Sequence, residues 1–173
     1  MSRTLLKMKE NAKIFKDDDY STKIETIQDI IPFIKKTDKI YDPYYCDGYV
    51  KAQWKLLGFE IHHERKDAYD LSLIPDYDVM ISNIPFSSKE KCVAHALSLG
   101  KPFMLLMPLS ALGSRWILKY WDKLQFIVPD GRYSYYKPDF PDRKHGSWFD
   151  SVWLCYGMNL AEKVIKLTRK EKA

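Results

Sequence analysis

From about residue 39 onward, short apolar runs bounded by turn residues alternate with longer amphipathic stretches. This alternation is typical of α/β proteins, in which helices cover a mostly parallel sheet. The pattern predicts central parallel strands over residues 39–42, 59–64, 78–82 and 103–107. Two later runs, 124–128 and 151–156, have no helical pattern of usual length between them. We therefore expect these two to pair as an antiparallel hairpin at one edge of a mixed sheet.

Helices are expected where apolar residues recur every three or four positions. The clearest case is the stretch 23–36, where the isoleucines follow this spacing. Further helices are expected over residues 49–57, 89–99 and 116–121. Only residues 65–77 separate the second strand from the third, which is too short for a full strand-helix-strand crossover with its turns. A strand is therefore expected to be missing or merged at this point.

Length and composition predict one soluble domain, since the chain has 173 residues, 46% of them hydrophobic and 29% charged. The strongest apolar stretch, 103–112, is interrupted by Pro108 and Ser110 and is shorter than the ~20 residues that a bilayer span needs. Lysines interrupt the apolar residues of the first segment, so no signal-peptide core is expected. We expect an intracellular protein, cytoplasmic or nuclear, without a membrane partner.

Basic residues gather at both ends of the chain, and the formal net charge is +5. We divide the chain into a basic N-terminal extension (1–16), a central domain (17–160) and a basic C-terminal tail (161–173). Such charge favours a polyanionic partner, such as a nucleic acid. The alternative is that these lysines form an ordinary solvated face.

Several common site chemistries lack their sequence signals. The three cysteines are widely spaced and form no Cys-x-x-Cys pair, so neither a disulfide framework nor a zinc site is expected. The adjacent His62 and His63 do not have the spacing of a helical metal site, and we assign each a core or surface role. No Gly-x-Ser-x-Gly elbow and no phosphate-binding loop occur. We predict no metal.

The most informative segment is Asn83-Ile84-Pro85-Phe86, which directly follows the third predicted strand. In open parallel sheets, ligands bind at the carboxyl ends of strands. An exocyclic aromatic amine is a poor nucleophile because its lone pair is delocalised, and two hydrogen-bond acceptors aimed at its hydrogens localise that pair. The alternative is a structural proline turn at the end of a strand.

Each residue of this segment suits amine chemistry in a different way. The side-chain oxygen of Asn83 and the backbone carbonyl of Ile84 would be the two acceptors. Pro85 restricts the preceding residue to an extended conformation that directs its carbonyl into the site. Phe86 offers a flat face on which a base removed from its helix would stack.

A second candidate segment is the loop 41–48, between the first predicted strand and the next helix. A strand, a tight loop with glycine and a helix N-terminus form a nucleotide-type pocket. The single Gly48 falls far short of the three-glycine dinucleotide fingerprint, so NAD is not expected. Asp42 or Asp47 would attract an ammonium group of the ligand, or would instead cap the following helix.

These segments resemble motifs of S-adenosylmethionine-dependent amino methyltransferases. Residues 83–86 resemble the Asp/Asn-Pro-Pro-Tyr/Phe motif, and residues 41–48 resemble the Asp-Pro-Phe-x-Gly-x-Gly cofactor motif. Residues 17–22 look like the opening of phage-type adenine methyltransferases, which closes over the methionine end of the cofactor. The resemblance to small phage-like and protist adenine methyltransferases runs from about residue 17 to residue 157. It implies a Rossmann-like class I methyltransferase fold, one strand short.

The activity that the resemblance implies is transfer of a methyl group to the exocyclic amine (N6) of adenine in DNA. Ile84 stands where the motif usually has Pro, and the Asn-Ile/Leu-Pro-Tyr/Phe form also occurs in ribosomal-RNA adenine dimethyltransferases. Adenine methylation of RNA is therefore the first alternative. A non-catalytic nucleic-acid-binding partner subunit with the same fold is the second.

The cofactor implied is S-adenosylmethionine, held by the opening, the 41–48 loop and the end of the second strand. Within the opening, an N-cap role for Ser21 or Thr22 is the structural alternative. We expect Glu64 to accept hydrogen bonds from the ribose and Asp67 from the adenine amino group. The predicted cofactor residues are Tyr20, Ser21, Thr22, Asp42, Pro43, Tyr44, Cys46, Gly48, Glu64 and Asp67.

A separate target-recognition domain of ~100 residues would not fit in this chain. Recognition is therefore local or supplied by a partner subunit. The loop 130–148 interleaves cations with aromatics, which suits phosphate contact and base stacking. The alternative is that its tyrosines only pack against the sheet edge. The predicted substrate residues are Arg115, Arg132, Tyr135, Tyr136, Lys137, Arg143, Lys144 and His145.

Overall fold

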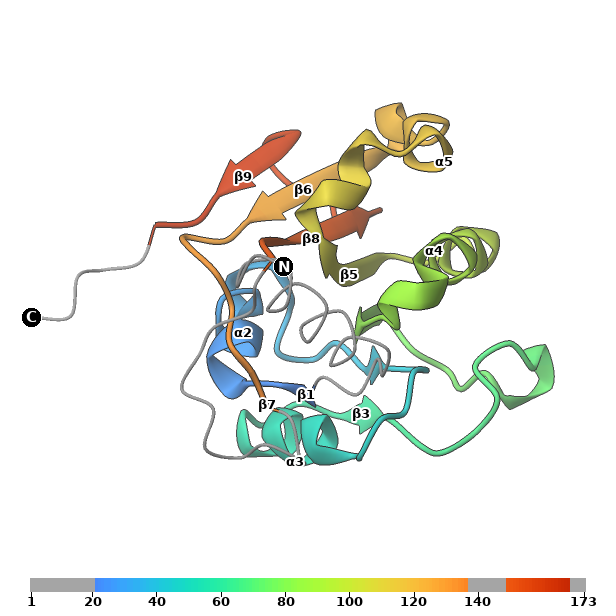
Figure 1. The fold of residues 1–173 in the computed structure, drawn as a ribbon. Coiled ribbons are helices and arrows are strands. Elements are labelled where there is room, and N and C mark those ends of the chain that lie inside the picture. The colour runs from blue at the N-terminus through green and yellow to red at the C-terminus, as the bar shows by residue number, and fades with distance from the viewer. Residues whose placement is uncertain (1–20, 137–148, 169–173) are drawn as a thin grey trace, which may run out of the picture.

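The computed structural model describes residues 21–136 and 149–168. In these residues, seven strands form one mixed sheet in the order β3-β2-β4-β5-β8-β6-β9 (Figure 1). The strands are β2 (Ile40–Tyr41), β3 (Ile61–His62), β4 (Val79–Asn83), β5 (Phe103–Pro108), β6 (Leu124–Val128), β8 (Ser151–Tyr156) and β9 (Val164–Lys166). All of them run in one direction except β8, which is antiparallel to its neighbours β5 and β6. The fold is Rossmann-like α/β, as expected.

The predicted strands are confirmed, and two of them, β6 and β8, have the predicted bounds. β2 to β5 are parallel, and β6 pairs with β8 in the predicted antiparallel sense. β9 is not among the predicted strands. It pairs with β6 in parallel and extends the sheet by one strand beyond the antiparallel pair.

The expectation that the sheet is one strand short is wrong in number, because the described residues form a seven-stranded sheet with β9 included. The place where a strand was expected to be missing, between β3 and β4, lies at the other end of the sheet, where β3 is the terminal strand. Between β3 and β4 the chain forms only a short 3₁₀ turn, η2 (Leu71–Leu73). The segment is too short to add a strand and a crossover helix. The end of β3 is therefore not followed by a further strand of this sheet.

Four α-helices are present in the described residues: α2 (Ile24–Gln28), α3 (Tyr49–Leu56), α4 (Lys89–Ser98) and α5 (Arg115–Leu118). The prediction of one helix over 23–36 is wrong in length, because α2 ends early and a 3₁₀ turn, η1 (Ile31–Phe33), follows. Pro32 explains the break, since proline lacks the amide donor of a helix and disfavours helical geometry in the preceding residue. The helix expected over 116–121 is likewise divided into α5 and the turn η5 (Trp121–Lys123).

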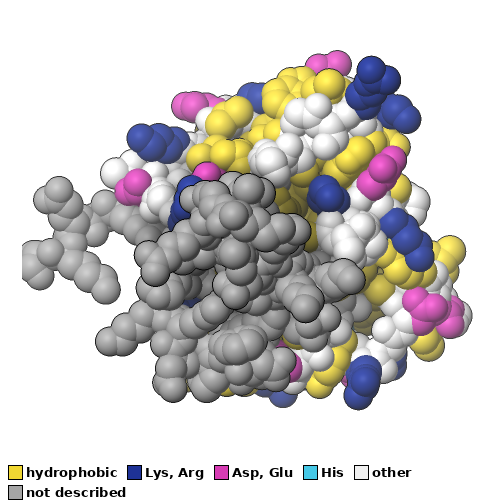
Figure 2. All heavy atoms as spheres, viewed as in Figure 1, with side chains coloured by type: hydrophobic (Ala, Val, Ile, Leu, Met, Phe, Trp, Pro, Cys, Tyr) yellow, Lys and Arg dark blue, Asp and Glu magenta, His cyan; other side chains and the backbone are white. Residues whose placement is uncertain are grey.

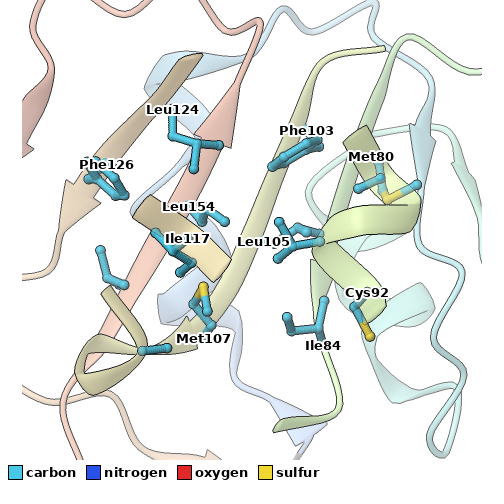
Figure 3. Packing of buried hydrophobic residues seen from close by; sticks show 14 of the residues in the cluster. Met80, Ile84, Cys92, Phe103, Leu105, Met107, Ile117, Leu124, Phe126 and Leu154 are labelled. Carbon is cyan, nitrogen blue, oxygen red and sulfur yellow. The ribbon is translucent and has the colours of Figure 1, made fainter. Parts of the chain in front are cut away.

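Helices cover both faces of the sheet (Figure 1). Successive strand residues point to opposite faces, so Leu105 packs with α4 and α5, whereas Leu106 packs with α2 and α3. Figure 3 shows the first of these cores, in which Cys92 of α4 and Ile117 of α5 lie over the strands. With both faces covered, the carboxyl ends of the parallel strands are the natural location for a ligand.

A second, two-stranded sheet joins distant parts of the chain. β1 (Ser21–Thr22) pairs antiparallel with β7 (Tyr135–Tyr136). Neither strand is among those predicted. Their pairing places the predicted cofactor opening against the predicted substrate loop. Across residues 21–136 and 149–168, no helix combines the length and the apolar character needed to cross a bilayer.

Candidate functional site

The two motifs lie on neighbouring strands. β2 leads into the 42–48 loop, β4 ends at Asn83, and these strands pair directly in parallel. β3 flanks β2 on its other side. The carboxyl ends of β2, β3 and β4 therefore form one edge, at which the predicted cofactor loop and the predicted catalytic turn are side by side.

Asp42 is buried at this edge, with 4% of its surface exposed. Its Oδ1 accepts a hydrogen bond of 2.5 Å from Ser82 Oγ of β4, and one of 3.3 Å from the backbone amide of Tyr44. Burial raises the pKa of the Asp42 carboxyl, while nearby His63 and the two hydrogen bonds act to lower it. The carboxylate thus joins β2 to β4 through contacts within the chain, and it does not cap α3.

His63, which directly follows β3, completes this group. Its Nδ1 lies 3.0 Å from the backbone oxygen of Asp42 and 3.5 Å from Asp42 Oδ2. Because the backbone oxygen only accepts, Nδ1 carries the proton. The imidazole of His63 also stacks on the ring of Tyr45, with the ring centroids 4.9 Å apart, and so contacts a second residue of the 42–48 loop.

The role of His63 was not predicted beyond a core or surface position. Its contact with Asp42 joins residues 21 positions apart, so no local pattern indicates it. The signal that was available is that a polar residue stands at the end of each of two predicted parallel strands, Asp42 in the first and His63 in the second. We refer below to Asp42, His63 and Ser82 as the buried polar group.

The rest of the loop is shaped by Gly48 and Asp47. Gly48 has φ +78°, a left-handed conformation that favours glycine, and a Cβ there would displace the hydroxyl end of Tyr45, which would lie 2.6 Å away. Asp47 accepts a hydrogen bond of 2.9 Å from the amide of Tyr49 at the start of α3. Of the two carboxylates considered for helix capping, Asp47 is therefore the one that stabilises the helix start. Cys46, which lies between Asp42 and Asp47 in the sequence, is exposed.

The described part of the opening lies against this loop. Ser21 Oγ donates to Asp47 Oδ2 at 2.5 Å, and Gln53 of α3 donates to the backbone oxygen of Thr22 at 2.7 Å. The residue before α2 is Lys23, so Ser21 and Thr22 do not occupy the N-cap position. Ser21 and Thr22 are thus brought to the predicted cofactor loop. Tyr20 lies outside the described residues.

Pro43, Glu64 and Asp67, three of the predicted cofactor residues, line one small hollow of about 80 Å³ that Tyr41 also lines. Glu64 forms a 2.6 Å ion pair with Lys66, whose hydrogen bond and charge lower the pKa of this exposed carboxyl. The hollow is smaller than the ~300 Å³ at which ligand pockets usually begin. The carboxylates of Glu64 and Asp67 place acceptor oxygens in its lining.

Asp67 and Tyr44 also contribute to the local structure. Asp67 Oδ1 accepts from the amide of Tyr69 at 2.9 Å. Tyr44 is partly buried, and its ring lies 6.2 Å from that of Tyr69. Burial is the largest of the causes that raise the pKa of the Tyr44 hydroxyl. Tyr44 therefore packs toward α4 and ties the cofactor loop to the segment after β3.

The turn 83–86 is anchored in the apolar core. Asn83 ends β4 opposite Leu106 of β5. Ile84 is only 2% exposed, and its side chain packs near Cys92 and Met107 (Figure 3). Pro85 has φ −62° and ψ 119°, which is extended backbone. The second position of the motif is thus a core residue in this chain.

Phe86 begins the 3₁₀ turn η3 (Phe86–Ser88) and contacts a row of aromatic rings. Its ring meets Phe149 edge to face at 5.3 Å, and Phe149 lies 5.7 Å from Tyr135. Tyr135 is partly buried and shares a hydrogen bond of 2.7 Å with Ser151; burial raises the pKa of its hydroxyl. Phe149 was not predicted. We call Phe86, Phe149 and Tyr135 the aromatic row.

The predicted substrate residues divide into several places. Tyr136 points away from the aromatic row and faces Tyr49 of α3 at 5.7 Å, with 37% of its surface exposed. Arg132 pairs with Asp150 at 2.9 Å and lines a separate hollow beside α2. Arg115 is the first residue of α5. Lys137, Arg143, Lys144 and His145 lie outside the described residues.

Within the described ranges, no three or more His, Cys, Asp or Glu side chains are grouped so as to hold a metal ion. Neither a protein-family model nor a curated protein matches the chain. Among solved structures, the chain is similar to a dimethyladenosine transferase from Plasmodium falciparum, with 15% identity and a TM-score of 0.49. The similarity covers 79% of this chain and 62% of that one, so the chain spans less than two thirds of the other protein's length.

Proposed function

We propose that the protein transfers a methyl group from S-adenosylmethionine to the exocyclic amine (N6) of adenine in DNA. The observation that carries the proposal is the position of Asn83-Ile84-Pro85-Phe86. This turn ends β4 beside β2, whose own end carries the loop with the cofactor motif. A methyl donor and an amine acceptor would therefore be held at adjacent strand ends.

The cofactor would lie across the ends of β2 and β3. When bound, it supplies a methyl group on a positively charged sulfur. Glu64 and Asp67 would accept hydrogen bonds from its nucleoside at the hollow that they line with Pro43. Asp47 is exposed, whereas Asp42 is buried in contacts with the chain. We therefore assign the ammonium group to Asp47, close to Ser21 of the opening.

The amine would be held at the turn by Asn83 Oδ1 and the backbone oxygen of Ile84. Both are acceptors, so they withdraw the amine hydrogens from the ring plane and localise the lone pair. Phe86 would support the flipped base by stacking. Alignment of the amine with the methyl group supplies most of the rate acceleration. The proton leaves the amine after the methyl group has been transferred, and water is a sufficient acceptor for it.

RNA is the alternative substrate, and one observation favours it. Ile84 is a core residue at the position where the amino-methyltransferase motif usually has Pro. The Asn-Ile-Pro-Phe form is similar to that of ribosomal-RNA adenine dimethyltransferases. A non-catalytic nucleic-acid-binding partner subunit is the third reading, and it predicts a pocket that does not bind the cofactor.

Two measurements test the proposal. Isothermal titration with S-adenosylmethionine should show saturable binding; absence of binding would leave only the non-catalytic subunit. Transfer of a tritiated methyl group from S-adenosylmethionine should then be measured to DNA and to RNA of matched sequence. Label in adenine of DNA supports the proposal, and label confined to RNA replaces it with the alternative.

A further inference from the structure

A hollow lies beside the turn 83–86, lined by residues of η3, α4 and α5. These two helices lie on the same face of the sheet (Figure 1). The volume of the hollow is about 410 Å³, within the ~300–1,000 Å³ of ligand sites. Residues that line it are Ser87, Ser88, Lys89, Glu90, Lys91 and Trp116. None of these residues has a role in the proposed function.

Its chemistry suits one unstacked nucleotide. Trp116 of α5 is partly buried and supplies a rigid aromatic face, and aromatic rings stack nucleobases of any sequence. Ser88 and Lys89 supply a hydroxyl and a cation, which are common phosphate ligands. Glu90 lies exposed at the rim, where a carboxylate accepts hydrogen bonds from amino groups of bases.

Lys89 connects this hollow to the catalytic turn. Its Nζ donates a hydrogen bond of 3.1 Å to the backbone oxygen of Phe86. An ammonium group has three donors, so two remain for another acceptor. Lys91, two residues further along α4, places its Nζ 3.6 Å from the centroid of the Tyr69 ring. Lys89 is therefore the cation better placed to serve both the turn and a ligand.

Side chains of both charges are mixed on the visible face of the described residues. Figure 2 shows lysine and arginine side chains spread over the side of the molecule beyond the grey segment, between apolar and acidic patches. Such mixed charge argues against a long phosphate track. It is compatible with a single phosphate contact beside a stacked base.

We propose that this hollow binds the nucleotide adjacent to the target adenine in an unpaired strand, with its base on Trp116 and its phosphate at Lys89 and Ser88. The inference rests on the proposed function and extends it to a second nucleotide. A phosphate held by Lys89 also holds the lysine against the Phe86 carbonyl, so occupation of the hollow stabilises the catalytic turn. Ribose and deoxyribose strands offer the same base and phosphate.

The test is binding of fluorescently labelled, adenine-containing single strands to the full chain without cofactor, followed by anisotropy. Trp116→Ala should weaken binding about 5- to 100-fold, the range of one lost base stack. Trp116→Phe should retain most of the affinity. Trp121→Ala is the matched control, because Trp121 is 37% exposed and lies in η5, outside the lining of the hollow. Equal affinities for Trp116→Ala and Trp121→Ala would overturn the proposal.

The phosphate contact has its own readout. Lys89→Met should reduce the slope of log affinity against log salt by about one, whereas Lys119→Met, an exposed lysine just after α5, should not. An unchanged slope for Lys89→Met overturns the phosphate contact. Thermal unfolding of each variant identifies any that fail to fold. If Trp116→Ala does not fold, the affinity of Trp116→Phe and the salt slope of Lys89→Met test the proposal.

DNA and RNA strands of the same sequence are compared in parallel, so the test also identifies the polymer. Trp116-dependent binding without any methyl transfer by the unmodified protein would overturn the proposed function alone. Methyl transfer with an unchanged kcat/KM in Trp116→Ala would overturn the flanking-nucleotide site alone. A chain that binds neither polymer would overturn both.

Discussion

The two halves of the open sheet edge are held together by different forces. On the cofactor side, the buried polar group of Asp42, His63 and Ser82 joins β2, β3 and β4 through hydrogen bonds. On the turn side, Ile84 and the aromatic row hold the chain by apolar packing. The first half depends on matched donors and acceptors, and the second depends on shape and volume.

This difference has a functional sense in the proposed reaction. A loop that holds a charged cofactor benefits from directional contacts that set its backbone. A turn that presents two acceptors to an amine must hold them in a fixed position, and close apolar packing fixes the position of the chain by shape. The two halves should therefore respond to different substitutions.

The largest effect is expected for Asp42→Ala. The change leaves Ser82 Oγ and the amide of Tyr44 without their side-chain acceptor in a buried site and removes the carboxylate 3.5 Å from His63 Nδ1, so the free energy of unfolding should fall by about 4 kcal/mol. Urea unfolding measures it. Asp76→Ala is the control, because Asp76 is exposed and pairs with lysines at the surface, and it should change stability far less. Equal losses in the free energy of unfolding for Asp42→Ala and Asp76→Ala would contradict a stabilising role of the buried polar group.

The turn side should respond to lost volume. Ile84→Ala removes apolar contacts from a residue that is 2% exposed, and the free energy of unfolding should fall by about 3 kcal/mol. Ile84→Val removes one methylene and should cost about 1 kcal/mol. Urea unfolding of both variants gives the comparison. If alanine and valine behave alike, the side chain is not packed as described.

A smaller effect is expected in the pH dependence of stability, and it concerns only the half that contains the buried polar group. Burial raises the pKa of Asp42 from 3.8, so the folded protein binds this proton more tightly than the unfolded chain. The corresponding stability is complete below 3.8 and is lost as the pH rises through the folded pKa. The stability of the unmodified protein minus that of Asp42→Asn should therefore decrease as the pH rises over this window. Unfolding curves at several pH values measure the difference, and a rise would contradict the burial argument.

The sequence predicted those elements whose signal is local. β6 and β8 have the expected bounds because both are uninterrupted apolar runs between turns. The prediction of one helix over 23–36 is wrong because it followed the isoleucine spacing and gave too little weight to Pro32. Proline lacks the amide donor that would continue α2. β1, β7 and β9 have two or three residues each and form only through pairing with distant segments. No periodicity exists in such short strands.

The same limit applies to the site. The turn 83–86 and the trio Pro43, Glu64 and Asp67 could be located because each follows a recognisable strand. The contacts of His63 and Phe149 could not be predicted, because their partners lie 21 and 63 positions away along the chain. Contacts between strand ends are set by the order of strands in the sheet, which the sequence alone left open.

The most direct test of the central claim is the variant Asn83→Ala, assayed for methyl transfer from S-adenosylmethionine to adenine in DNA and RNA. Titration with the cofactor should give an unchanged Kd, since the cofactor contacts proposed lie on β2 and β3. Turnover should fall by about 10²-fold or more, because one of two acceptors at the amine is removed. Unchanged turnover in a folded Asn83→Ala protein that still binds the cofactor would contradict the account.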